Sequence, residues 1–123
     1  MLIDAYFSHV EGVISHAPKV LTTELVKDKR SPYIGFLEGR LHFEDGSLLQ
    51  FVEFVNVKTA VERYKYTYHY QDQAGRLVFR YDMAPHHKDV TTFPHHKHLV
   101  SGETVDSHTP TLEEILNEID ALL

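Results

Sequence analysis

Residues 62–82, ERYKYTYHYQDQAGRLVFRYD, show the clearest strand pattern in the sequence. Its first nine residues alternate with a period of two, and side chains spaced in this way lie on opposite faces of a β-strand. The segment QDQAG contains a glycine and separates this run from a second one, RLVFRYD. Two such runs joined by a short glycine-containing connection are typical of an antiparallel β-hairpin.

The predicted hairpin has an aromatic face and a basic face. In its first strand Tyr64, Tyr66, Tyr68 and Tyr70 face one way, and Arg63, Lys65, Thr67 and His69 face the other. Two interpretations of the tyrosines are open, namely burial beneath helices and an exposed ladder on which nucleic-acid bases stack. In either case a phosphate can bind to the basic face, because arginine supplies paired donors and a sheet holds them still. The residues that we expect to meet there are Arg63, Lys65, His69 and Arg80.

The pattern on either side of the hairpin predicts helix, strands and helix. Apolar residues at 3, 7, 10 and 14 have helical spacing, and Ala17-Pro18 ends that helix. Three runs with strand character follow, with an Asp-Gly turn between the second and the third: VLTTELVKD, SPYIGFLEGRLHF and SLLQFVEFVNV. An apolar stripe over 112–123, with Thr111 and Glu114 as a capping box, predicts the last helix. We therefore expect an α+β fold in a single domain, residues 1–123: a curved antiparallel sheet of about five strands, arranged as a meander and flanked by an N-terminal and a C-terminal helix.

Composition narrows the class of protein. The chain of 123 residues has no cysteine, which excludes disulfides and thiolate zinc sites. It has no apolar run long enough to span a membrane, and its N-terminus lacks a basic signal region, so we expect a cytoplasmic protein. The net charge of −6 is unevenly spread, since residues 103–123 carry only acidic charges while 63–98 are basic and rich in histidine. That distribution permits an anionic ligand at one region of an acidic protein.

Five histidines lie in the stretch APHHKDVTTFPHHKH, residues 84–98. We expect a loop here, at the mouth of the basic face, because prolines precede both histidine doublets. Three roles remain open for it. It can hold a metal such as zinc, it can supply general acids and bases, or it can be a structural or interface segment.

Acid–base chemistry on RNA requires a base for the 2′-hydroxyl, an acid for the leaving oxygen and cations for the phosphorane. Asp82 can orient a histidine or Arg80. The candidate catalytic residues are Arg80, Asp82, His86, His87, His95, His96 and His98. The candidate substrate-binding residues are Arg63, Lys65, His69, Tyr81 and Lys97. No cofactor is expected on this interpretation, and zinc bound by the histidine loop is the alternative.

The run YKYTYHYQDQAGRLVFRYDMAPHHKDVTTFPHHKHL, followed after a spacer by SHTPTLEEILNEI, resembles the TumE family of toxin–antitoxin proteins. Its most specific pieces are YHYQD, FRYD with APHH, and FPHHKH. Met83 departs from the family pattern, which favours a polar residue at this position. The resemblance implies the toxin of a two-gene module and, by analogy with other small toxins, an activity on RNA.

The expected function is therefore that of a type II toxin, a metal-independent endoribonuclease. A non-catalytic module that binds nucleic acid or protein and a histidine-ligated metalloprotein are the alternatives. The resemblance implies a helix-turn-helix antitoxin as the protein partner. RNA is the expected ligand, no membrane is expected, and a homodimer is a further possible assembly.

Overall fold

The computed structural model describes residues 1–83, 95–101, 104–106 and 109–123, with the backbone alone at 95, 96 and 104–106. Helix α1 spans Ile3–Ser15 and helix α2 spans Leu112–Leu122. Between them lie, in chain order, β1 (Val20–Lys29), β2 (Ile34–Phe43), β3 (Leu48–Asn56), β4 (Glu62–Gln71), β5 (Leu77–Met83), β6 (His95–Leu99) and β7 (Thr104–Asp106).

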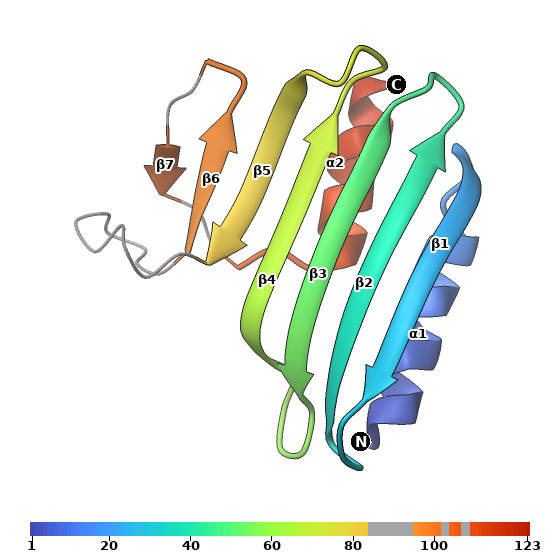
Figure 1. The fold of residues 1–123 in the computed structure, drawn as a ribbon, viewed down its shortest axis with the longest axis vertical. Helices are drawn as coiled ribbons and strands as arrows, with labels where there is room; N and C mark the ends of the chain where they lie inside the picture. Colours follow the sequence, from blue (N-terminus) through green and yellow to red (C-terminus); the bar gives the residue numbers. More distant parts are fainter. Residues whose placement is uncertain (84–94, 102–103, 107–108) are drawn as a thin grey trace.

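Across the described residues the strands form one antiparallel sheet of seven, in which spatial order equals chain order. Both helices lie behind the same face of this sheet (Figure 1). The other face is called the open face below. The predicted α+β meander with a helix at each end is confirmed. The expectation that residues 84–98 form a loop is wrong for 95–98, which belong to β6 and pair with β5, and residues 84–94 lie outside the described residues.

The predicted turns have the backbone that their glycines allow. Gly46 and Gly75 adopt φ values of 86° and 84° in the β2–β3 and β4–β5 connections, a region that side chains rarely enter. Gly35 serves a different purpose, because a Cβ there would lie 2.6 Å from Ile3 Cγ1 and 2.7 Å from Phe7 Cζ. Its missing side chain lets α1 pack directly on β2.

The core lies between the sheet and the two helices, and it settles the two interpretations of the tyrosines. Tyr66, Tyr68 and Tyr70 are buried in it, as the first interpretation predicts. Helix α2 adds four buried apolar residues and begins with the predicted capping box of Thr111 and Glu114. Among the described residues, neither helix is long and apolar enough to span a bilayer.

A register shift breaks the alternation predicted for β4. Phe54 pairs with Lys65 but the next residue, Val55, pairs with Arg63, so Tyr64 is the extra residue of a β-bulge. Arg63 therefore points into the helix-covered side, where it donates to Tyr68 Oη at 3.0 Å and to the carbonyl of Pro110. Tyr64 is displaced to the open face and is 45% exposed. The expectation that Arg63 joins Lys65 and His69 on one face is wrong, and so is the burial of Tyr64.

The bulge supplies a cation to a buried carboxylate that the sequence did not reveal. Glu53 is 1% exposed and accepts hydrogen bonds from the hydroxyls of Tyr6 and Tyr68. Burial, reinforced by the Glu53 carboxylate, raises the pKa of both tyrosines, so both stay neutral and keep donating. Arg63 completes the group through its bond to Tyr68, and its guanidinium lies 5.3 Å from the centre of the Tyr66 ring.

Arg63→Met should lower the free energy of unfolding by about 3–5 kcal/mol, because it leaves a buried carboxylate without its cation. The double variant Glu53→Gln/Arg63→Met should lose less than the two single changes added together, since no buried charge remains unpaired. Urea denaturation followed by circular dichroism measures both.

Lys65→Met is the matched control, because Lys65 is exposed on the open face of the same strand. We expect it to change stability by less than about 0.5 kcal/mol. If Arg63→Met were as mild as this control, the buried group would not stabilise the fold.

Candidate active site on the open face of the sheet

The two faces of the β5–β6 pair carry different chemistry. Because side chains alternate along a strand, Arg80 and Asp82 lie on the face opposite to Phe79 and Tyr81. Phe79 and Tyr81 are buried on the helix side, so Arg80 and Asp82 belong to the open face. His98 is the register partner of Arg80 on β6 and shares that face.

Asp82 is the centre of a cluster of charged and titratable groups. Its Oδ2 atom lies 3.0 Å from Arg80 Nε and 3.2 Å from His98 Nε2. Although it belongs to the open face, Asp82 is only 7% exposed. A carboxylate between a guanidinium and an imidazole fixes the orientation of both and favours the proton on the imidazole nitrogen that faces it. We call Asp82, Arg80, His98 and His69 the Asp82 cluster.

His69 joins the cluster from β4, where it is the register partner of Arg80. The three residues therefore form one row across three strands, with Arg80 in the middle. Neighbouring strands are about 4.8 Å apart, so His69 and His98 stand about 10 Å apart at their backbones. Partial burial, and then the nearby Arg80 charge, lower the pKa of His69 below that of an ordinary imidazole. A lowered pKa keeps this imidazole neutral at physiological pH, as a proton acceptor must be.

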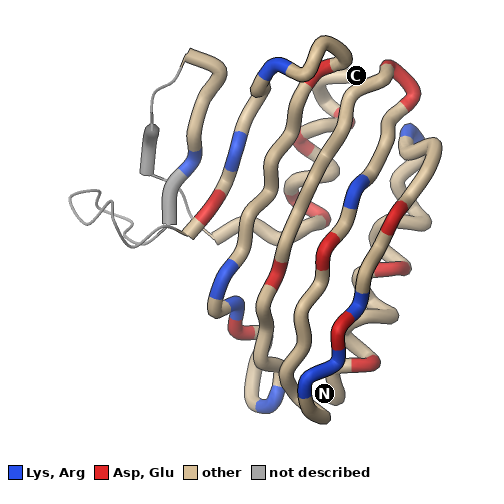
Figure 2. Tube along the Cα trace, in the orientation of Figure 1, with Lys and Arg blue, Asp and Glu red and all other residues tan. Residues whose placement is uncertain are grey.

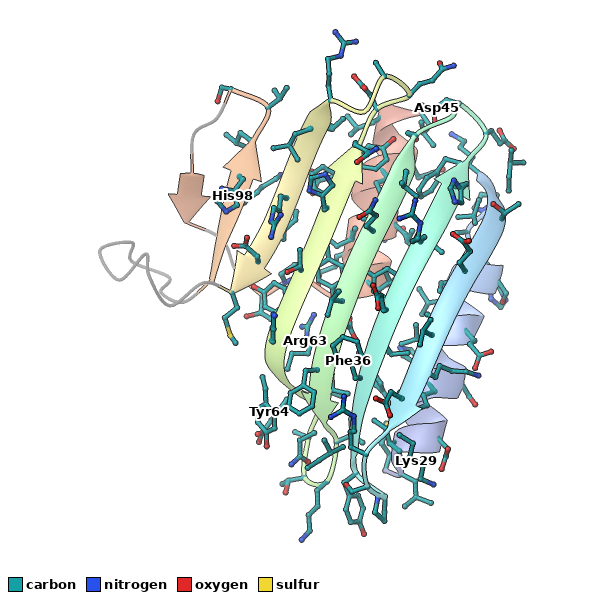
Figure 3. The ribbon with its side chains drawn as sticks, in the orientation of Figure 1. Lys29, Phe36, Asp45, Arg63, Tyr64 and His98 are labelled. Carbon is teal, nitrogen blue, oxygen red and sulfur yellow. The ribbon has the colours of Figure 1, made fainter. Side chains whose placement is uncertain are left out.

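The structure brings together four of the sequence-predicted site residues, His69, Arg80, Asp82 and His98. Lys65 lies on the same face of β4 as His69. It is two residues before Thr67, which pairs with Asp82. Figure 3 shows His98 on the front of β6, on the face opposite to the helices. The polar face of this hairpin was predicted, and so was a contact of Asp82 with a histidine or Arg80; which histidines converge was not.

Besides Arg63, two more predicted binding residues lie on the other face. Tyr81 Oη donates to Glu118 Oε1 of α2 at 2.7 Å, and Lys97 Nζ lies 2.9 Å from Glu118 Oε2. The Lys97 ammonium is also 4.7 Å from the centre of the Tyr81 ring and 5.3 Å from that of Phe79. These contacts link β6 to α2. Tyr81 and Lys97 therefore lie on the opposite face of the sheet from the Asp82 cluster.

The remaining predicted histidines are placed only in part. His96 and His95 are the register partners of Asp82 and Met83, and the structure describes their backbone alone. His86 and His87 lie outside the described residues. Within the described part of the chain, no group of three or more His, Asp or Glu side chains is arranged to hold a metal ion. Of the histidine doublets considered as zinc ligands, His86–His87 lies outside that part, and His95–His96 is described by its backbone alone.

The two sides of the open face carry different charges, and Figure 2 marks the acidic and basic residues along the strands. Its β1 and β2 positions include the acidic residues Glu24 and Glu38, which flank Arg40. Its β4 and β5 positions carry Lys65 and Arg80, and Asp82 there already contacts Arg80 and His98. An anionic ligand is therefore favoured over the β4–β6 side, where the Asp82 cluster lies.

Comparison with known proteins gives one match. Neither a curated protein nor a solved structure matches the chain significantly. The family described as Toxin TumE matches residues 10–123, which is nearly the whole chain and includes the Asp82 cluster. A toxin role, and with it an antitoxin partner, follows from that family. The chain belongs to the TumE toxin family.

Proposed function

We propose that the chain is the toxin of a type II toxin–antitoxin module and cleaves RNA by metal-independent acid–base chemistry at the Asp82 cluster. One observation carries the proposal: two imidazoles stand on either side of Arg80, and a nearly buried carboxylate contacts Arg80 and one of them. This arrangement offers a cation for a phosphate and a proton-transferring group on each side of it.

Each residue has a distinct role in the proposed reaction. His69 accepts the proton of the ribose 2′-hydroxyl, whose oxygen then bonds to phosphorus. His98, held by Asp82, donates a proton to the 5′-oxygen as the bond between that oxygen and phosphorus breaks. The products are a 2′,3′-cyclic phosphate and a 5′-hydroxyl end. Arg80 neutralises the extra negative charge of the phosphorane, and Asp82 positions both Arg80 and His98. His86, His87, His95 and His96 stay candidate acids or bases on the strength of the sequence alone.

The proposed partners are RNA and a helix-turn-helix antitoxin, in the cytoplasm. An edge of the sheet that pairs with no other described strand supports contact with a second protein, whether the antitoxin or another copy of the chain. Strand β1 is the terminal strand of the sheet and is ten residues long. Its exposed apolar side chains include Leu21 at 65% and Val26 at 58%. An edge of this kind presents backbone donors and acceptors to which another chain can add a strand.

The single variants His69→Ala and His98→Ala should each slow RNA cleavage by about 10²–10⁴-fold, the usual contribution of a general acid or base. His42→Ala should leave the rate unchanged, because His42 is a histidine on β2 whose ring contacts Glu24 rather than the Asp82 cluster. The measurement is a time course with 5′-labelled single-stranded RNA and protein prepared without a histidine tag. The rate of the unmodified chain should be the same with and without EDTA.

The other outcomes identify the alternative functions. Loss of cleavage in EDTA, with zinc found by elemental analysis, would assign the histidines to a metal. RNA binding without cleavage by the unmodified chain would make it a binding module. Cleavage that survives both histidine changes would place the reaction elsewhere in the molecule.

Arg80→Gln should raise the pKa of His69, because it removes a positive charge that disfavours the imidazolium. The pKa should remain below that of a free histidine, since burial is the larger cause of the shift and persists. The low-pH limb of the cleavage profile should move to higher pH with it, as a base must be unprotonated to act. NMR titration of the His69 ring measures the pKa.

Arg76→Gln is the charge-matched control for that titration. Arg76 lies in the exposed β4–β5 turn and pairs with Asp72 at 3.0 Å. Its removal should leave the pKa of His69 unchanged. An equal shift in the two variants would mean that net charge, rather than the neighbouring Arg80, sets the titration.

A further inference from the structure

Three aromatic side chains form a patch on the open face, below the Asp82 cluster in the view of Figure 3. Phe36 of β2 is the register partner of Phe54 of β3, and the rings of Phe54 and Tyr64 lie 5.6 Å apart at 44°. Phe36 and Phe54 are partly exposed, and Tyr64 is 45% exposed. We call Phe36, Phe54 and Tyr64 the aromatic platform.

The aromatic platform is held in place before any ligand arrives. Tyr64 Oη accepts a hydrogen bond from Asn56 Nδ2 at 2.9 Å, which fixes the outer end of the ring. The bulge at Tyr64 fixes its backbone, because Arg63 is anchored on the other side of the sheet. The helices pack on the opposite face, so the fold does not require aromatic rings here for its core. Fixed, exposed rings are suited to stacking with planar ligands.

A free cation lies beside the aromatic platform. Lys65 is the register partner of Phe54 and is exposed, and among the described residues it forms no ion pair. In contrast, Lys27 and Lys29 on β1 pair with Glu11 and Asp4 of α1. Planar rings next to an uncommitted ammonium match a base next to a phosphate.

The spacing connects the aromatic platform to the Asp82 cluster. Lys65 and His69 share a face of β4 and are four residues apart, which corresponds to about 13 Å along a strand. Between them the face carries Thr67, which is neither charged nor large. A short single strand of nucleic acid can therefore contact both places at once, with its backbone following the basic side of the open face.

We propose that the aromatic platform is a base-binding subsite for single-stranded RNA. A base next to the cleaved linkage stacks on Tyr64 and Phe54, its phosphate contacts Lys65, and the scissile phosphate lies at the Asp82 cluster. This assignment rests on the proposed function, and it adds the substrate class: an unpaired segment, because a base inside a duplex cannot offer its face to a protein ring.

The first experiment measures binding separately from cleavage. Binding of a fluorescein-labelled single-stranded RNA is followed by anisotropy in the His98→Ala background. Tyr64→Ala should weaken binding by roughly 5- to 150-fold, the range expected from the loss of one stacked base. Leu122→Ala, which removes an exposed apolar side chain from α2 on the other side of the sheet, should have no effect. An oligomer of the same length with abasic sites should bind weakly and equally to the parent and the Tyr64→Ala variant.

A second variant keeps the test valid if Tyr64→Ala disturbs the fold. The chain contains no tryptophan, so Tyr64→Trp introduces a single reporter ring at the aromatic platform. It should retain RNA affinity, and its fluorescence should be quenched by the RNA but not by the abasic oligomer. Unchanged fluorescence at saturating RNA would overturn the subsite.

The outcomes separate this proposal from the proposed function. If the unmodified chain cleaves RNA, and the parent and the Tyr64→Ala variant bind RNA with equal affinity, the subsite is overturned but the proposed ribonuclease activity is not. RNA binding that depends on Tyr64, without cleavage, would support the subsite and contradict the proposed ribonuclease activity. A Tyr64→Ala variant that binds RNA normally but no longer binds the antitoxin would make the platform a protein interface, and would overturn the proposal.

Discussion

The buried carboxylate of Glu53 is the constraint on which the arrangement of this fold depends. A charge in the core requires hydrogen bonds and a cation, and here they come from elements far apart in the chain. Tyr6 brings α1, Tyr68 brings β4, and Arg63 reaches the carbonyl of Pro110 just ahead of α2. One buried group thus joins both ends of the chain to the centre of the sheet. The bulge that turns Arg63 inward also turns Tyr64 outward, so a requirement of the core determines what the open face presents.

The β5–β6 pair shows how one alternating sequence serves two purposes. Of the segment FRYD, Phe79 and Tyr81 belong to the core side, and Arg80 and Asp82 belong to the open face. Lys97 and His98 divide in the same way, the first contacting Glu118 and the second contacting Asp82. Neighbouring residues of the sequence therefore differ in role: one set fastens β6 to α2, and the other forms the Asp82 cluster.

The sequence was sufficient for those parts of the fold that depend on local patterns. Helical spacing, capping residues and glycine turns predicted both helices and the first five strands, while strand alternation left open whether the tyrosines at 66, 68 and 70 are buried. The bulge could not be predicted, because it depends on the burial of Glu53. A glutamate in an apolar strand does not reveal which face of the sheet it lies on. Strand β6 was missed because two prolines and a run of histidines are typical of a loop, while its partner β5 decides its conformation. Strand alternation correctly placed Lys65, His69 and Arg80 on one face of the hairpin, and it misplaced Arg63, where the bulge interrupts the alternation.

The neighbour-to-neighbour order of the strands has a consequence for how the chain acquires its structure. Every strand pairs with the strand next to it in sequence, so the sheet can grow hairpin by hairpin without long loop closures, which favours rapid folding. A sheet that stopped growing before β4 would not be stable, however. An intermediate that ends at β3 would bury Glu53 beneath α1 with neither Tyr68 nor Arg63 to satisfy it, because both belong to β4. We therefore expect the first stable unit on the folding pathway to include β4, and a chain emerging from the ribosome to gain most of its native stability only once residues 62–71 are available.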